Sequence, residues 1–264
     1  LLEFLLLKKI TKVDVLLLSH ADKDHIAGLL SLLSSKQIQL SQVYLNSDSD
    51  KKSKLWDDLV YALYDYDKQG KMNFETSLTP HLNGKLNQGD VNVEVLAPNK
   101  YIAAKSPGSK DRKGRRLTSN SISAVIRLSF KGNPVALLPG DLDTVGLDNL
   151  LEDHTDIKTW LTVYPHHGGR PGDGDAVTFS TRFCTLVQPE VVVFSIRENT
   201  QHFPTKEVVE AVQKSNAGVR MYTTRSSDVL VSHIEQTRNA NHHDCVGHMQ
   251  IDFEQNPLGV SFGC

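Results

Sequence analysis

The stretch LLLSHADKDHIAG, residues 16–28, decides how the rest of this sequence is interpreted. A run of three leucines stops abruptly, and five of the next seven residues are Ser, His, Asp, Asp and His. The apolar run over residues 13–19 predicts a strand that is covered on both faces. The spacing of the apolar residues over 24–35 predicts a helix directly after it. Potential ligands are therefore concentrated where a buried strand turns into a helix.

These polar residues have the chemistry of a metal site. Imidazole and carboxylate groups are accepted as ligands by zinc, manganese and iron. His20, Asp22, Asp24 and His25 could bind one ion, or a pair of ions that share a water. The alternative is that Asp22 or Asp24 only caps the helix and that both histidines are surface residues.

Two later stretches favour the metal site. VALLPGD, residues 135–141, is another apolar run that ends in a carboxylate, Asp141. VYPHHGG, residues 163–169, ends in the paired imidazoles of His166 and His167. Ligand sites of α/β sheets lie at the carboxyl ends of strands. Helix capping does not explain His and Asp at the ends of all these strands.

Composition describes an ordinary globular protein. The 264 residues are 39% hydrophobic and 23% charged, with neither a repeat nor a long linker, so we expect a single domain over residues 1–264. The net charge of −2 excludes a globally basic nucleic-acid binder, but not a local basic patch. Three scattered cysteines argue against a disulfide framework and predict a reducing, cytoplasmic compartment. No apolar run has the length that spans a bilayer.

The first ten residues, LLEFLLLKKI, are typical of the end of a packed helix. They have neither the basic leader nor the cleavage site of a signal peptide. Since there is no initiator Met, we expect the chain to begin inside a longer protein.

Periodicity predicts an α/β domain with helices on both outer faces. Predicted strands cover residues 13–19, 43–45, 90–96, 122–130, 134–138, 159–164, 191–194, 219–222, 229–232 and 247–253. Predicted helices cover residues 24–35, 55–64, 144–152 and 176–187, and a further helix is opened by Pro204.

The motifs resemble those of the metallo-β-lactamase superfamily, in its ComEC-like branch of DNA-uptake metallohydrolases. The resemblance covers roughly residues 5–225. It rests on His-x-Asp-x-Asp-His at 20–25, Asn120-Ser121, Gly-Asp at 140–141, His-His-Gly at 166–168 and SIRENTQHFP at 195–204. It implies a four-layer αββα sandwich, from which the family's N-terminal strands are missing in this chain.

The resemblance also implies residue roles. His20 and Asp22 would hold a first ion, Asp24 and His25 a second, and Asp141 would bridge the pair. His167, directly before Gly168, matches the last metal-binding His, with His166 as the second choice or as a hydrogen-bond donor to the site.

This sequence departs from the family pattern at two positions. Asp22 stands where the family usually has His, and Asn120 lies near the place of another frequent His ligand. More oxygen ligands favour manganese or magnesium relative to zinc. We therefore expect two divalent ions, zinc or manganese, with magnesium also possible.

Such a pair of ions suits phosphodiester hydrolysis, and we expect a phosphodiesterase or nuclease that acts on DNA. Asp24 or Asp141 would accept the proton of the attacking water. His202, placed at the start of the helix opened by Pro204, is the predicted proton donor to the leaving group. The alternative for His202 is a hydrogen-bonded loop residue.

A basic segment, KSPGSKDRKGRR at residues 105–116, predicts a mobile loop that could hold a polyanionic backbone. Its candidate nucleic-acid contacts are Lys105, Lys110, Arg112, Lys113, Arg115 and Arg116. Tyr101 before it could stack on a base. The alternative is a solvated loop without a ligand.

Other functions remain open on the sequence alone. One is a small-molecule metallohydrolase acting on a thioester, lactam or cyclic nucleotide. Another is a metal-binding subunit, with partner proteins, of a larger assembly such as an anti-phage defence complex. The His242, His243, Cys245 and His248 cluster fits no standard zinc spacing, so a polar turn before a strand is the better interpretation.

Overall fold

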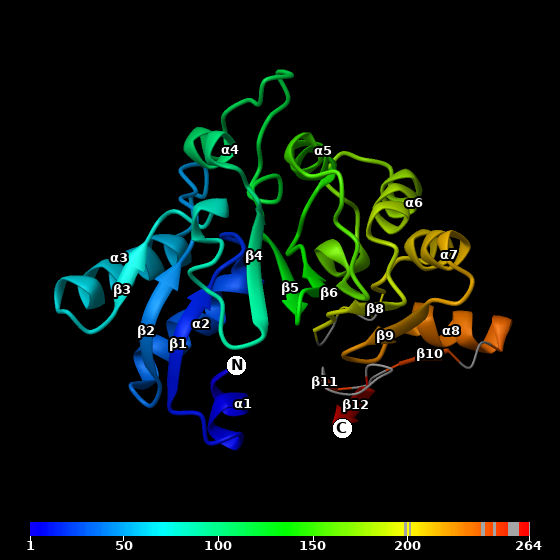
Figure 1. The fold of residues 1–264 in the computed structure, drawn as a ribbon, viewed down its shortest axis with the longest axis horizontal. Helices are drawn as coiled ribbons and strands as arrows, with labels where there is room; N and C mark the ends of the chain where they lie inside the picture. Colours follow the sequence, from blue (N-terminus) through cyan, green and yellow to red (C-terminus); the bar gives the residue numbers. More distant parts are fainter. Residues whose placement is uncertain (198–199, 201, 239–240, 245–246, 253–258, 264) are drawn as a thin grey trace.

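The fold is built on two β-sheets with helices along their outer faces (Figure 1). The computed structural model describes residues 1–197, 200, 202–238, 241–244, 247–252 and 259–263. Within these residues no helix is both long enough and apolar enough to cross a membrane.

The first sheet has three parallel strands in the order β1-β2-β3. The second has seven strands in the order β10-β9-β8-β7-β6-β5-β4, parallel from β6 to β10 and antiparallel at β4 and β5. A separate hairpin joins β11 and β12. The strands are β1 (Lys12–Leu17), β2 (Gln39–Tyr44), β3 (Asn73–Glu75), β4 (Val91–Ala97), β5 (Val125–Phe130), β6 (Asn133–Leu138), β7 (Leu161–Val163), β8 (Val191–Phe194), β9 (Arg220–Thr223), β10 (His242–His243), β11 (His248–Asp252) and β12 (Gly259–Gly263).

The helices divide between the two sheets (Figure 1). Those beside the first sheet are α1 (Leu2–Leu7), α2 (Lys23–Ser35) and α3 (Lys54–Lys68); those beside the second are α5 (Thr144–Asp153), α6 (Ala176–Val187), α7 (Lys206–Ser215) and α8 (Asp228–Thr237). A short helix α4 (Lys100–Lys105) and the 3₁₀ turns η1 (Pro80–Leu82) and η2 (Pro165–Gly168) lie in connections.

Apolar stripes on these helices form the core. Ile26 of α2 and Leu59 of α3 are fully buried in one cluster with Val43 of β2. Phe183 of α6 and Phe194 of β8 are likewise fully buried in the largest cluster, under α5 to α8. Burial of these side chains fixes each helix against its sheet and therefore fixes the connections between strand and helix.

The two sheets also contact each other. Leu17 and Tyr44, at the ends of β1 and β2, pack against a cluster that contains Val95 of β4 and Ile126 of β5. The carboxyl ends of the parallel strands β6, β7 and β8 share one edge of the second sheet. Since β5 is antiparallel to β6, the residues just before β5 lie at this same edge. The end of β1 thereby meets polar residues from several strand ends.

Most predicted elements are confirmed, with differences of a few residues at their boundaries. Lys131 and Gly132 have positive φ in the tight turn between β5 and β6, as a two-residue hairpin requires. The predicted strand at residues 229–232 is wrong, because this stretch lies in α8. The Ser227 side chain caps that helix by accepting a hydrogen bond from the Leu230 N–H. Periodicity alone cannot distinguish a strand from a helix in so short an apolar run, and the cap favours the helix.

Candidate metal centre

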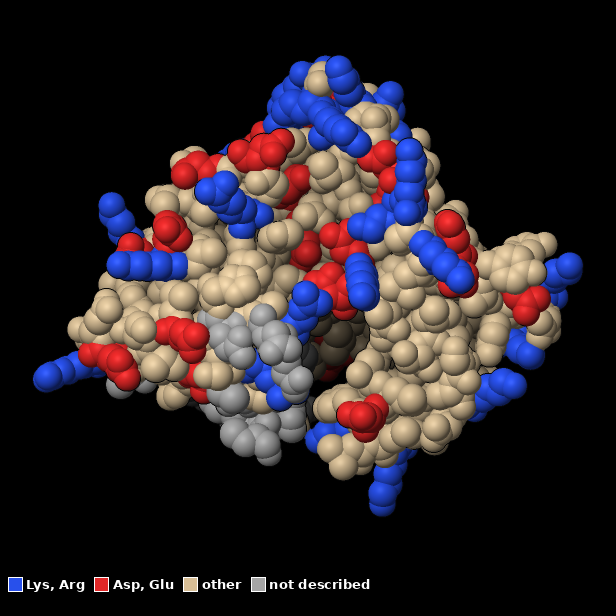
Figure 2. Space-filling view, turned by 180° about the vertical axis from the view of Figure 1, so that it is seen from behind, with Lys and Arg blue, Asp and Glu red and all other residues tan. Residues whose placement is uncertain are grey.

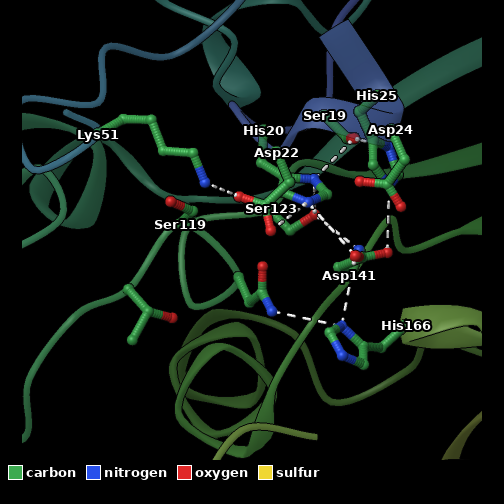
Figure 3. A network of polar contacts seen from close by, with 12 residues as sticks. Ser19, His20, Asp22, Asp24, His25, Lys51, Ser119, Ser123, Asp141 and His166 are labelled. Carbon is green, nitrogen blue, oxygen red and sulfur yellow. Dashed lines mark hydrogen bonds and ion pairs between the residues drawn. The ribbon is translucent and has the colours of Figure 1, made fainter. Parts of the chain in front are cut away.

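Three connections bring the predicted site residues together. His20 and Asp22 lie between β1 and α2, and Asp24 and His25 lie in the first turn of α2. Asp141 follows β6, and His166 and His167 lie in η2 directly after β7. The proximity predicted from the strand ends is therefore what the structure shows (Figure 3).

Asp141 is at the centre of the cluster, and its side chain is only 5% exposed. Its carboxylate oxygens lie 3.4 Å from His20 Nε2, 3.3 Å from His25 Nε2 and 3.3 Å from His166 Nδ1. His167 Nε2 is 3.9 Å away on the same side as Asp24. One buried carboxylate thus faces imidazoles from two separate segments, the start of α2 with the loop before it and η2.

The side chains divide into two groups that could each hold an ion, the ligand atoms of each group lying within 4.8 Å of one another. One group comprises Asp24, His25, Asp141 and His167; the other comprises His20, Asp22 and Asp141. Asp141 belongs to both. The spacing therefore suits two ions that share one carboxylate, which is the arrangement that the sequence resemblance implies.

Unpartnered nitrogens show that these residues fit a metal. Among the described residues, His20 Nε2 and His25 Nε2 are buried and lack a hydrogen-bond partner. The opposite nitrogens are occupied, since Ser19 Oγ lies 3.0 Å from His20 Nδ1 and 3.2 Å from His25 Nδ1. A buried polar nitrogen without a partner is costly. An ion beside Asp141 would satisfy both nitrogens.

Helix capping does not account for the two carboxylates of the β1–α2 connection. Asp22 is at the N-cap position of α2, but its side chain makes no capping hydrogen bond. Asp24 Oδ2 instead lies 3.1 Å from His167 Nε2, across 143 residues of sequence.

His166 and His167 have different surroundings. The Nδ1 of His167 donates to the Ser195 carbonyl oxygen over 2.7 Å, which leaves its Nε2 directed at Asp24. Such a bond from one ring nitrogen commonly orients a metal-binding His. His166 Nδ1 lies 3.3 Å from Asp141 Oδ2. The same nitrogen lies 3.3 Å from the side-chain amide nitrogen of Asn120, in the segment before β5. These contacts favour His167 as the candidate ligand and His166 as its neighbour.

The turn that holds both histidines is strained. His166 has φ 51° and His167 has φ 56°, so two consecutive residues with side chains adopt the left-handed region. This conformation costs about 1–2 kcal/mol for each such residue. Strain of this kind concentrates at functional sites, where it fixes the direction of side chains.

The site alters the pKa values of its members. The hydrogen bond from His167 lowers the pKa of Asp24 to about 2 and raises the pKa of His167. Burial alone would raise the pKa of Asp141, but the His166, His20 and His25 rings that face its carboxylate outweigh this effect and lower that pKa. The hydrogen bond to Asp141 raises the pKa of His166. Both carboxylates are therefore ionised at neutral pH.

These shifts predict how metal binding depends on pH. The raised pKa of His167 means that this ring is protonated below that pKa, and an ion must displace the proton. At pH values below the pKa of His167, we expect the apparent affinity for Zn²⁺ or Mn²⁺ to fall by about tenfold per pH unit if the ion displaces one proton. Titration calorimetry in buffers of different ionisation enthalpy would detect the released proton. A pH-independent affinity from pH 5 to 8 would contradict the assignment of His167.

Sequence reasoning missed the residues that support the ligands. Ser123 Oγ accepts a hydrogen bond from the Asp141 backbone N–H at 3.1 Å and lies 3.4 Å from His20 Nδ1. Ser19 and Ser123 thus contact the Nδ1 atoms of these histidines, opposite the Nε2 atoms that face Asp141 (Figure 3). Both serines are adjacent to strand ends, but a serine carries no signal that distinguishes such a role from a turn.

Gly140 is required by the same contacts. It has φ +56°, and a Cβ built there would lie 2.2 Å from Ser123 Oγ and 3.0 Å from Ser19 Cβ. We expect Gly140→Ala to lower the free energy of unfolding by more than about 2 kcal/mol, since the backbone cost is about 1–2 kcal/mol before the collision is counted.

Denaturant unfolding would measure this loss, with Gly84→Ala as the control. Gly84 also has positive φ, at +83°, but open space around its Cβ position, so it carries the backbone cost alone. Equal losses in the two variants would show that the contact with Ser123 is unimportant.

His202 does not join the cluster. It is exposed on the turn before α7, and its ring packs against Phe203 with centroids 4.3 Å apart. The helix begins at Lys206 with Thr205 as its N-cap, so His202 is not at the helix N-terminus that the prediction assumed. Its role as proton donor stays a prediction. Asn199 of the same motif lies outside the described residues.

Two of the C-terminal histidines, His242 and His243, have structural contacts. His242 is buried, with Nε2 2.6 Å from Gln213 Oε1, and the ring of His243 stacks on Tyr222. Burial lowers the pKa of His242 to about 4. The polar turn expected here is therefore wrong for His242 and His243, which form strand β10 beside β9. Cys245 lies outside the described residues.

The basic segment has more contacts than the mobile loop expected from its sequence. Arg115 donates to Asp111 and Asp148, and Arg116 pairs with Asp50 at 2.7 Å. The Arg112 guanidinium lies over the Tyr101 ring at 4.8 Å, so this ring is covered by its own chain. Lys105, Lys110, Arg112, Lys113 and Arg116 are exposed, whereas Arg115 is partly buried. Basic side chains gather at the projecting end of the molecule (Figure 2).

Comparison with known proteins gives a distant relationship. No family model matches the chain. The chain is 26% identical over 223 residues to ComE operon protein 3 of Bacillus subtilis, an alignment that covers 83% of this chain and 24% of that protein. It thus spans about a quarter of the length of this curated relative. Among solved structures, Igni18, described as a metallo hydrolase from the archaeon Ignicoccus hospitalis, aligns with a TM-score of 0.39 and 12% identity over 79% of this chain and 75% of that one. By sequence and by its His and Asp motifs, the chain is a distant, metallo-β-lactamase-like homologue of ComE operon protein 3 (ComEC).

Proposed function

We propose that the protein is a dinuclear metal-dependent hydrolase of the αββα metallo-β-lactamase type and that it cleaves phosphodiesters of nucleic acid, with DNA as its substrate. The observation that carries the proposal is the pair of ligand groups that share Asp141. His20 and Asp22 would hold one ion, and Asp24, His25 and His167 the other. The oxygen-rich set suits manganese or magnesium as well as zinc.

The residues have separate tasks in this proposal. Two bound ions would lower the pKa of a water between them and neutralise charge on the phosphoryl oxygens. Asp141, almost fully buried, would hold the two halves of the site together. Asp24 is more accessible, with 32% of its side chain exposed against 5% for Asp141, so we assign Asp24 as the acceptor of the proton from the attacking water.

Two observations support nucleic acid as the substrate. The motifs at residues 20–25 and 166–168 resemble the branch associated with DNA uptake. The exposed cations of residues 105–116 lie at the projecting end of the molecule (Figure 2), and Arg116 pairs with Asp50, the neighbour of Lys51, whose Nζ contacts Asp22. A phosphate backbone attracts such a group of cations without regard to base sequence.

The direct test is hydrolysis by the purified protein. It should be incubated with single- and double-stranded DNA, with RNA and with a small chromogenic phosphodiester, each with Zn²⁺, Mn²⁺ or Mg²⁺ and with a chelator. We expect metal-dependent cleavage of DNA that the chelator removes. Cleavage that persists in chelated buffer, or no cleavage of any phosphodiester with any of these ions, would refute the proposal.

A small-molecule hydrolase is the second candidate, and one observation favours it. A cavity of about 500 Å³ lies between the two sheets, with mostly apolar side chains such as Leu17, Val93 and Ile126. Ser19, His25 and Gly140 form part of its wall, so it adjoins the candidate metal centre. Hydrolysis of a thioester, lactam or cyclic nucleotide in place of DNA would favour this candidate. If the protein is instead a metal-binding subunit of an assembly with partner proteins, it should hydrolyse none of these substrates.

A further inference from the structure

Lys51 lies beside the candidate metal centre, although nothing in its sequence context marks it. It belongs to the connection between β2 and α3, and its Nζ contacts Asp22 Oδ1 (Figure 3). The side chains of Lys51 and Asp22 are 28% and 29% exposed, whereas those of His20 and Asp141 are 0% and 5% exposed. Lys51 is therefore at the open side of the cluster, where a substrate would arrive.

The backbone at Lys51 is fixed by a buried carboxylate. Asp48 Oδ1 accepts hydrogen bonds from the backbone N–H groups of Asp50 and Lys51, at 3.2 and 3.0 Å. Its other oxygen accepts from Ser119 Oγ at 2.5 Å. Asp48 is only 5% exposed, so its hydrogen bonds hold this turn in one backbone conformation. The turn fixes the backbone at Lys51, and the contact with Asp22 places the Nζ atom.

The same turn connects the cluster with the basic segment. Asp50 pairs with Arg116, and Ser119 follows the segment by three residues. Lys51 thus lies between the exposed cations of residues 105–116 and the candidate ligands. A polyanion that contacts both would pass Lys51.

The two oxygens of Asp22 are directed differently. Oδ2 is 3.9 Å from His20 Nε2, on the side where an ion would sit, and Oδ1 faces Lys51. An ammonium group has three N–H donors, and among the described residues Asp22 is the partner of the Lys51 side chain. Lysine can hold one carboxylate oxygen and still donate to a second anion beside it.

We propose that Lys51 is an anion-binding residue of the site and donates to a non-bridging oxygen of a phosphoryl group. This inference rests on the proposed hydrolytic function for its substrate class. The anion subsite itself can be tested by binding measurements, which do not require the protein to be active.

The test is binding of inorganic phosphate to the metal-loaded protein by titration calorimetry. We expect Lys51→Met to weaken phosphate affinity by about 10- to 100-fold, since a hydrogen bond to a charged group is lost, and Lys51→Arg to restore part of it. Lys52→Met is the matched control, because Lys52 is the neighbouring lysine and is exposed; it should bind phosphate like the wild type. Affinity for Mn²⁺ should be the same in all these proteins.

Three outcomes would overturn the inference. Equal phosphate affinity in Lys51→Met and Lys52→Met, or no phosphate binding by the wild type, would exclude an anion subsite at Lys51. Parallel losses of Mn²⁺ and phosphate affinity would show that Lys51 only positions Asp22. If phosphate binds as expected but no phosphodiester is cleaved, the proposed function fails and the anion subsite stands. On an active protein, Lys51→Met should also lower kcat/KM for a phosphodiester by a similar factor.

Discussion

Asp141→Asn is expected to abolish metal-dependent hydrolysis, with kcat/KM reduced by more than about a hundredfold. Mutating a residue that only hydrogen-bonds to a metal ligand already lowers metal affinity or activity by about 10- to 100-fold. Asp141 is itself a candidate ligand and belongs to both ligand groups, so its loss should cost more. The amide keeps the size of the side chain but removes the negative charge that three imidazoles face at 3.3–3.4 Å. The variant should also lose metal-induced stabilisation, which the wild type should show at about 2.7 kcal/mol when the ion is at a hundredfold its Kd.

The control for this variant is Asp14→Asn on β1. Asp14 is exposed and pairs with Lys12 at the surface, an interaction worth about 0–1 kcal/mol. Its activity and metal response should match the wild type. Thermal melts with and without Mn²⁺ would separate a folded, metal-free Asp141→Asn protein from a misfolded one. Full metal stabilisation in Asp141→Asn would contradict the role of Asp141 as a shared ligand.

The metal-free Asp141→Asn protein is also expected to be less stable than the wild type at neutral pH. The lowered pKa of Asp141 means that its carboxylate stabilises the fold above the unfolded-state pKa of about 3.9 and loses this contribution as the pH falls through the folded-state pKa. The stability difference between wild type and variant should therefore shrink in acid.

The location of the site was predictable because sequence position and sheet geometry coincide there. Apolar strands end directly before His20, Asp141 and His166, and in a sheet with parallel strands such ends meet at one edge. The helix of residues 24–35 was also predictable, since its apolar spacing continues over several turns. Local pattern and tertiary packing agree in these segments.

Other parts of the site depend on contacts that no local pattern records. Lys51 reaches Asp22 across 29 residues, and Ser123 reaches His20 across 103. Lysine and serine are frequent at every surface, so only the fold selects these two. The same holds for Arg115, whose ion pairs with Asp111 and Asp148 distinguish it from the exposed cations beside it.

The basic segment yields the second large expected effect, and the structure decides which cations to change. Arg115 is held by Asp111 and Asp148, and Arg116 pairs with Asp50 beside Lys51, so replacing either would disturb the fold or the site. Lys110 and Arg112 are exposed, and Lys113 has only a surface partner, Glu152. The informative variant therefore changes Lys110, Arg112 and Lys113 together to Gln.

If these three side chains contact phosphates, the variant should bind DNA more weakly and with a smaller salt dependence. Each lost contact reduces the slope of log affinity against log salt concentration by about 0.7 on single strands or about 0.9 on duplex. The expected change is therefore about 2 on single strands and about 3 on duplex, measured by fluorescence anisotropy between 50 and 300 mM salt. Hydrolysis of a small chromogenic phosphodiester should hardly change, because a substrate of that size reaches the metal centre without the segment.

A charge-matched control separates a local contact from a change in net charge. Lys68, Lys85 and Lys158 are exposed and lie outside the basic segment, and their change to Gln removes the same three charges. The control should keep the salt slope of the wild type, and both variants should keep its melting temperature, since surface changes away from special contacts usually alter stability by less than about 0.5 kcal/mol. An unchanged slope in a well-folded Lys110, Arg112 and Lys113 variant would refute the nucleic-acid role of the segment. It would then favour a small substrate, for which the apolar cavity beside His25 offers room next to the metal centre.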